Sequence, residues 1–132
     1  MAQEPKQGDI VHVELITKEV AGAKKFFGDL FGWKFEDMPQ MGYSMWQSPG
    51  NMSGGLMAPR PEQPGTGQPL NYIYVDSIDV MAPRIEKAGG KVVVPKTAIP
   101  GFGWFAFFKY PEEMIWGLYE SEKKPAKGEP PK

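Results

Sequence analysis

The chain has 132 residues, enough for one domain and too few for two independent ones. It contains no cysteine, which excludes a disulfide framework, a thiol nucleophile and a thiolate zinc site. Fifteen basic residues balance sixteen acidic ones, and this near-neutral charge provides no basic stripe for nucleic acid.

No apolar run approaches the roughly 20 residues of a membrane span. The first residues, MAQEPKQGD, lack the apolar region of a signal peptide. Together these features predict a cytoplasmic domain with neither a nucleic-acid nor a membrane partner. Many glycines and prolines beside 13% aromatic residues favour short strands, tight turns and large rings that fill a core or line a pocket.

The first half begins with an alternating segment, IVHVELI, at residues 10–16. Alternation places His12 and Glu14 on one face of this predicted strand. A helix is predicted to follow, with Thr17 as its cap and Gly32 at its end, because glycine accepts the left-handed turn. The apolar residues at helical spacing are Val20, Ala23, Phe26, Phe27, Leu30 and Phe31.

The second half repeats this order. Residues 70–75, LNYIYV, are predicted to form a strand, and Ser77 or Asp79 is predicted to cap the next helix. Starting that helix near Val80 places Pro83 in the first turn, where the missing amide proton costs little. The pair Gly89-Gly90 ends it.

The two halves also match residue by residue. A shift of 58 lays Val20 on Ile78, and a shift of 62 lays Pro49 on Pro111 and Gly55 on Gly117. Each half then has the order strand, helix, strand, strand, strand. Chance similarity between small α+β segments is the alternative, but the matching proline, glycine and helix-end positions favour a true repeat.

The predicted fold is therefore α+β: two βαβββ modules form curved mixed sheets around a central hollow, with the helices outside. The predicted single domain covers residues 8–121, with module 1 at 8–58, a Pro/Gly linker at 59–69 and module 2 at 70–121. Residues 122–132 are predicted to be a disordered tail, because they contain prolines, lysines and no large apolar group.

Two segments resemble the vicinal oxygen chelate superfamily: HVELITKEVAGAKKFFGDLFGWKF in module 1 and KYPEEMIWGLYE in module 2. That group includes glyoxalase I, extradiol dioxygenases and bleomycin- or fosfomycin-resistance proteins. The resemblance extends from Gly8 to about Glu120. Within the superfamily, the chain is similar to the branch of small glyoxalase-like proteins. It implies the two-module fold and a homodimer, whereas function is not inherited with the fold.

The resemblance also implies where a metal would bind. Metal-dependent members hold a divalent ion through side chains of the first and last strand of each module. The matching positions here are His12, Leu70, Gly55 and Gly117, and only the histidine has a donor side chain. One imidazole gives no useful affinity for a divalent ion, so no metal and no other cofactor is predicted. A shifted site that uses His12 and Glu14 is the alternative.

Alternation predicts which residues face the hollow between the modules. They are His12, Glu14, Gly55, Leu70, Tyr72, Tyr74, Gly117 and Tyr119. The two glycines are expected to leave space in an aromatic-walled pocket that suits a small organic molecule. The alternatives are that His12 is a hydrogen-bonded residue without chemistry, and that the tyrosines belong to the core or to dimer contacts.

Two functional hypotheses follow. The first is a metal-independent protein that binds a small hydrophobic or aromatic molecule in this pocket. The second is a metal-dependent glyoxalase-like lyase, isomerase or dioxygenase, in which His12 and Glu14 are the candidate catalytic residues. The first is favoured because only His12 of the four metal-ligand positions has a donor side chain, and the chemistry of these positions restricts function more than a shared fold does.

Overall fold

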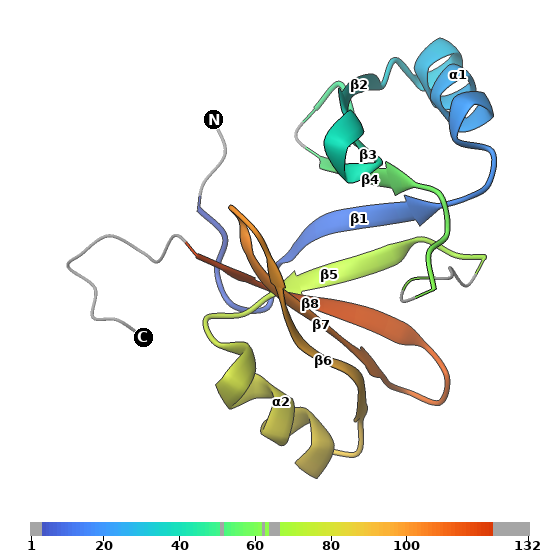
Figure 1. Cartoon of the computed structure of the whole chain (residues 1–132). Helices are drawn as coiled ribbons and strands as arrows, with labels where there is room; N and C mark the ends of the chain where they lie inside the picture. The colour runs from blue at the N-terminus through green and yellow to red at the C-terminus, as the bar shows by residue number, and fades with distance from the viewer. Residues whose placement is uncertain (1–3, 51, 62, 64–66, 123–132) are drawn as a thin grey trace. The chain divides into compact units, whose positions relative to one another are not determined.

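The structure, a computed structural model, describes residues 4–50, 52–61, 63 and 67–122. Its elements in chain order are β1 Ile10–Ile16, α1 Val20–Phe31, β2 Lys34–Met38, the 3-10 helix η1 Pro39–Met41, β3 Tyr43–Gln47, β4 Ser53–Met57, β5 Leu70–Tyr74, α2 Ile78–Lys87, β6 Lys91–Ile99, β7 Gly103–Lys109 and β8 Ile115–Ser121 (Figure 1). The predicted α+β class and the repeated βαβββ order are confirmed. Apart from Glu122, the predicted tail lies outside the described residues.

Contacts divide the chain into two compact units. Unit 1 contains Val11–Asn71, and unit 2 contains Glu4–Ile10 together with the described residues from Tyr72 onward. The segment before β1 joins unit 2 because the Gly8 amide donates to the Tyr74 carbonyl. The single domain at residues 8–121 stays a prediction.

Each unit has the same strand order and pairing. In unit 1 the order is β2-β3-β4-β1, and in unit 2 it is β6-β7-β8-β5. The pairs β1–β4 and β5–β8 are parallel, and the others are antiparallel. Glu14 is level with Gly55, and Tyr72 is level with Gly117. The shifts of 58 and 62 found in the sequence therefore relate equivalent positions, which confirms the repeat.

The ends of both helices depart in part from the sequence prediction. The N-cap residue of α1 is Glu19, whose side chain makes no capping hydrogen bond. The predicted cap Thr17 lies two residues earlier, and its hydroxyl accepts from the Glu19 amide. Gly32 ends this helix in the left-handed conformation, as predicted. Ser77 caps α2, since its hydroxyl accepts from the Val80 amide.

Pro83 was predicted to lie in the first turn of its helix, and this is wrong. α2 begins at Ile78, so the proline is in the helix interior. There it removes one backbone donor, a cost that the packing of the helix on its sheet offsets.

In the part of the chain that the structure describes, no helix has the length and apolar character needed to span a membrane.

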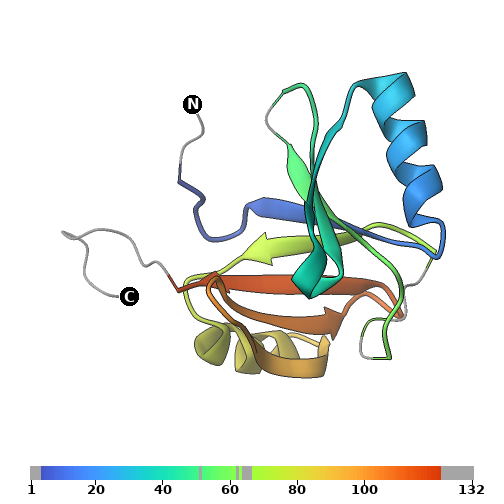
Figure 2. The ribbon, with the colours of Figure 1, turned by 45° about the horizontal axis from the view of Figure 1, so that its top comes forward.

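The two helices differ in how they pack. α2 lies along β6, β7 and β8 (Figure 2) and contributes Ile78 to a buried core with Val75, Ala106 and Leu118. α1 contacts β2 and has no buried residue. Its apolar side chains Phe26, Leu30 and Phe31 are more than half exposed. The homodimer predicted from the sequence stays a prediction.

A hydrogen-bonded carboxylate joins α1 to β2 and β3. Asp37 Oδ1 lies 2.6 Å from Lys24 Nζ and accepts from the Ser44 hydroxyl at 2.6 Å. The lysine first, and then the serine, lower the pKa of Asp37 below its ordinary value of 3.8. The ionised Asp37 carboxylate thus stabilises the folded state above pH 3.8, and this stabilisation is lost as the pH falls through the lower pKa of the folded state.

We expect Asp37→Asn to lower the melting temperature by a few degrees at neutral pH, an effect that shrinks as the pH falls below 3.8. Thermal unfolding of both proteins across pH 2 to 7 measures this difference. Asp29→Asn is the control, because the Lys25–Asp29 pair is an exposed i,i+4 contact. A difference for Asp37→Asn that stays constant down to pH 2 would contradict the assignment.

Candidate functional site

The only histidine of the chain is hydrogen-bonded to a tyrosine that the sequence analysis did not select. His12 on β1 lies with its Nε2 2.7 Å from the hydroxyl of Tyr43, the first residue of β3. The two rings are nearly parallel, with an interplanar angle of 10°. The histidine side chain remains 23% exposed, so this pair stays accessible from solvent.

A buried carboxylate lies beside this pair. Glu14 is 4% exposed, and its Oε2 lies 3.8 Å from His12 Nε2. Its Oε1 accepts a long hydrogen bond of 3.5 Å from Gln63 Nε2. The predicted shared face of His12 and Glu14 therefore brings the two side chains together. We call His12, Glu14 and Tyr43 the polar cluster.

Gly55 makes this cluster possible. It is level with Glu14, and a Cβ at this position would collide with the Tyr43 hydroxyl and the Glu14 carboxylate. The expectation that Gly55 leaves open space for a ligand is therefore wrong. Side chains from both neighbouring strands occupy that space, because a strand position without a side chain allows an adjacent residue to lie across it.

The same holds at the equivalent position in unit 2. A Cβ at Gly117 would lie 2.5 Å from Tyr72 Cδ2, so the tyrosine ring covers this glycine. The expected space at Gly117 is thus filled as well. Tyr72 is 6% exposed and packs at 5.9 Å, centroid to centroid, against Phe107.

The remaining predicted residues are largely buried. Leu70 and Tyr74 are each 7% exposed, and burial raises the pKa of the Tyr74 hydroxyl above its ordinary value of 10.0. The Tyr119 hydroxyl donates to the Phe102 carbonyl at 2.9 Å. The structure therefore brings His12, Glu14 and Gly55 together in unit 1, while Tyr72, Tyr74, Gly117 and Tyr119 belong to unit 2. Tyr72 and Tyr74 pack as core tyrosines, one of the alternatives left open by the sequence, whereas Tyr119 is half-buried.

The residues at the family's ligand positions do not fit a divalent metal. Gly55 and Gly117 cannot accept a ligating side chain without displacing the groups that cover them. His12 Nε2 is already engaged with the Tyr43 hydroxyl. Across residues 4–50, 52–61, 63 and 67–122, no three histidine, aspartate or glutamate side chains are grouped as metal ligands. Three or more such ligands are usual for a protein-bound transition metal.

Sequence reasoning missed Tyr43 and Gln63. Gln63 lies in the predicted linker, where it also pairs with Arg60 in a short backbone bridge. A signal for Tyr43 was present, because aromatic side chains often cover glycines on neighbouring strands. Using that signal required the β3–β4 register, in which Met45 pairs with Gly55 and Tyr43 lies two residues further along the same face.

A family model described as "Bleomycin resistance protein-like N-terminal" matches residues 9–49. A Mycobacterium bovis protein, CFP32, described as a candidate glyoxylase, is 31% identical over 126 residues, covering 91% of this chain and 48% of CFP32. The Streptomyces peucetius anthracycline biosynthesis protein DnrV is 29% identical over 122 residues, covering 80% of this chain and 44% of DnrV. The chain thus spans about half the length of these curated relatives.

Among solved structures, a glyoxalase/bleomycin resistance protein/dioxygenase superfamily member from Vibrio splendidus matches with a TM-score of 0.64 and 15% identity, covering 86% of this chain and 99% of that one. These similarities define the class as a protein built from paired βαβββ modules. The chain belongs to the vicinal oxygen chelate superfamily, on its glyoxylase-like side.

Proposed function

We propose that this protein binds a small hydrophobic or aromatic molecule without a metal, with the polar cluster as the polar end of its site. The observation that carries the proposal is the Tyr43 hydroxyl, which lies over Gly55 and is 2.7 Å from His12 Nε2. In metal-dependent members of the family, the residue at the position of Gly55 would extend a metal-binding carboxylate into this place. A hydroxyl, an imidazole and a carboxylate at one place can instead orient a polar group of an organic ligand.

The same face of unit 1 supplies apolar surface. The strand registers place the half-buried Met38 and Met45 on the face that carries the polar cluster. Methionine is flexible and polarizable, and it is common at surfaces that adapt to different apolar ligands. A relative named for anthracycline biosynthesis is consistent with a small organic ligand.

The test uses 1-naphthol, a planar aromatic molecule with one hydroxyl. We expect it to raise the melting temperature of the protein, since a ligand of the native state stabilises that state. Tyr43→Phe keeps the ring but removes the hydroxyl, and should weaken binding about fivefold, the effect of one hydrogen bond. Isothermal titration measures both affinities.

Tyr119→Phe is the matched control, because Tyr119 belongs to unit 2 and its hydroxyl is bonded to the Phe102 carbonyl. Equal affinity of Tyr43→Phe and the wild type would contradict the role of the cluster. No stabilisation by 1-naphthol or by a panel of apolar compounds would contradict the binding function. Stoichiometric Ni²⁺, Zn²⁺, Mn²⁺ or Fe²⁺ retained after desalting would contradict its metal-free nature.

A second candidate is a glyoxalase-like lyase, isomerase or dioxygenase that uses His12 and Glu14. The observation in its favour is the 3.8 Å separation of His12 Nε2 from Glu14 Oε2, which places an imidazole and a carboxylate within reach of the same substrate group. Turnover of a family substrate that is lost in His12→Ala would favour this candidate over binding alone.

A further inference from the structure

The repeated architecture allows equivalent places in the two units to be compared. In unit 1 the indole of Trp33 is stacked between two other rings. Its centroid lies 4.5 Å from that of Phe27 on α1 and 3.9 Å from that of Trp46 on β3. Trp46 is 4% exposed, while Phe27 and Trp33 are half-buried, so the stack extends from the buried face of β3 toward α1.

The equivalents in unit 2 follow from the shifts of 58 and 62. Phe27 corresponds to Ile85, Trp46 to Phe108 and Trp33 to Lys91. The registers support this: Trp46 pairs with Gly54 on β4, and Phe108 pairs with Trp116 on β8, again 62 residues on. The position that inserts an indole in unit 1 thus has an exposed lysine in unit 2.

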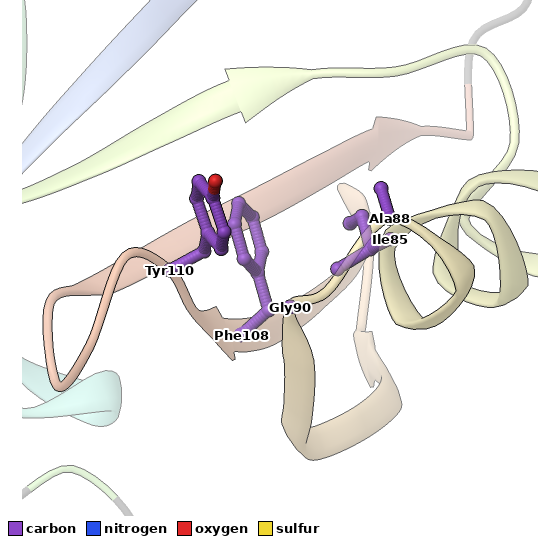
Figure 3. A pocket seen from close by; sticks show the side chains of 5 residues that line it. All are labelled: Ile85, Ala88, Gly90, Phe108 and Tyr110. Atoms are coloured by element: carbon purple, nitrogen blue, oxygen red, sulfur yellow. The ribbon is translucent and has the colours of Figure 1, made fainter.

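Unit 2 has a depression where unit 1 has its indole. It has a volume of about 220 Å³ and is lined by Ile85, Ala88, Gly90, Phe108 and Tyr110 (Figure 3). Two of its walls, Ile85 and Phe108, are the equivalents of the residues that enclose Trp33, and Lys91 is not part of the lining. The left-handed residue after the helix is Gly89 here, one position earlier than in unit 1, so the turn also differs.

We propose that this depression is a binding site for the planar aromatic ring of a small molecule. The ring would lie between Ile85 on α2 and Phe108 on β7, as Trp33 lies between its neighbours. Offset stacking on Phe108 and the burial of apolar surface provide the affinity. Figure 3 shows the Tyr110 ring beside that of Phe108, and Tyr110 is half exposed, so its hydroxyl can bond to a ligand at the rim. This site is separate from the polar cluster, which belongs to unit 1.

The test is a titration of the full chain with indole, followed by proton–nitrogen correlation spectra. We expect saturable shifts of the backbone amides of Ala88, Gly89, Gly90 and Tyr110, with a dissociation constant on the order of 1 mM for so small a molecule. Cyclohexanol, which is not planar, should shift the same amides at least several-fold less at equal concentration. Shifts confined to other amides, or equal shifts with cyclohexanol, would overturn the proposal.

Two variants fill the depression in different ways. Lys91→Trp places an indole at the position of Trp33, and Ala88→Trp fills the depression from the helix side. Both positions are exposed, so folding should be retained, and each variant should bind indole at least tenfold more weakly. Lys87→Trp is the control, because Lys87 is exposed on the same helix end but does not line the depression.

Wild-type affinity in both filling variants would overturn the proposal. Tyr43→Phe separates this site from the proposed function, because it should leave the indole shifts at Ala88 and Gly90 unchanged. If Tyr43→Phe leaves the affinity for 1-naphthol unchanged, only the proposed role of the polar cluster is contradicted. Failure of indole to shift the amides of this depression affects only this site.

Discussion

Replacing Gly54 by alanine is expected to lower the free energy of unfolding by about 3 kcal/mol, the upper end of the usual cost of overpacking. A Cβ at this position would overlap the Val13 carbonyl and lie 2.7 Å from Trp46 Nε1. The Val13 carbonyl is backbone of the adjacent parallel strand and cannot move aside. The indole is held there because its Nε1 donates to that same carbonyl at 3.2 Å.

Urea unfolding of the full chain measures this loss. Gly50→Ala is the matched control, because nothing lies within 4 Å of a Cβ at Gly50 and its backbone is not in the left-handed region. The control should change the unfolding free energy by less than about 0.5 kcal/mol. A loss for Gly54→Ala no larger than that of the control would show that β1 and β4 do not approach as described.

Replacing Glu120 by alanine is expected to cost about 3 kcal/mol, because it removes the partner of a buried backbone donor. The residue is 5% exposed, and its Oε1 accepts from the Ile78 amide, at the start of α2, at 2.8 Å. Lys96 Nζ lies 3.7 Å from the same oxygen. The carboxylate also has a favourable interaction with the helix N-terminus.

Glu120→Gln keeps an acceptor for the Ile78 amide but loses the charge, so its cost should be about half that of alanine. Glu122→Ala is the control at a nearby exposed carboxylate. Thermal and urea unfolding of the three variants give the ranking. If glutamine and alanine cost the same, the hydrogen bond to the Ile78 amide would not be the source of the stability.

The candidate site was predictable in part. Alternation along β1 correctly placed His12 and Glu14 on one face, because strand geometry is local. Glu120 lies three residues after Gly117 and therefore on the opposite face of β8, where its carboxylate accepts from the Ile78 amide. The contents of the space over the two glycines were not predictable, because they depend on which residues the neighbouring strands bring there.

Tyr43 illustrates the difference. Nothing in the segment MGYSMW marks its hydroxyl as the partner of an imidazole 31 residues earlier. The hydrogen bond requires β3 to lie beside β4 and β4 beside β1, with Met45 level with Gly55 and Gly55 level with Glu14. Two registers must combine before the contact exists, and each is set by packing across the sheet and not by local preference.

The family was recognisable from the resemblance of two sequence segments. Local patterns in the sequence also predicted the repeated βαβββ order and the shared face of His12 and Glu14. These follow from periodicity, glycine and proline positions and residue types, all of which act over a few residues. Tertiary packing alone shows that Gly55 and Gly117 are covered by side chains, and that one unit stacks an indole where the other has a depression. Those outcomes depend on which side chain from a distant segment fills a given volume, and close packing settles that only once the strands are in register.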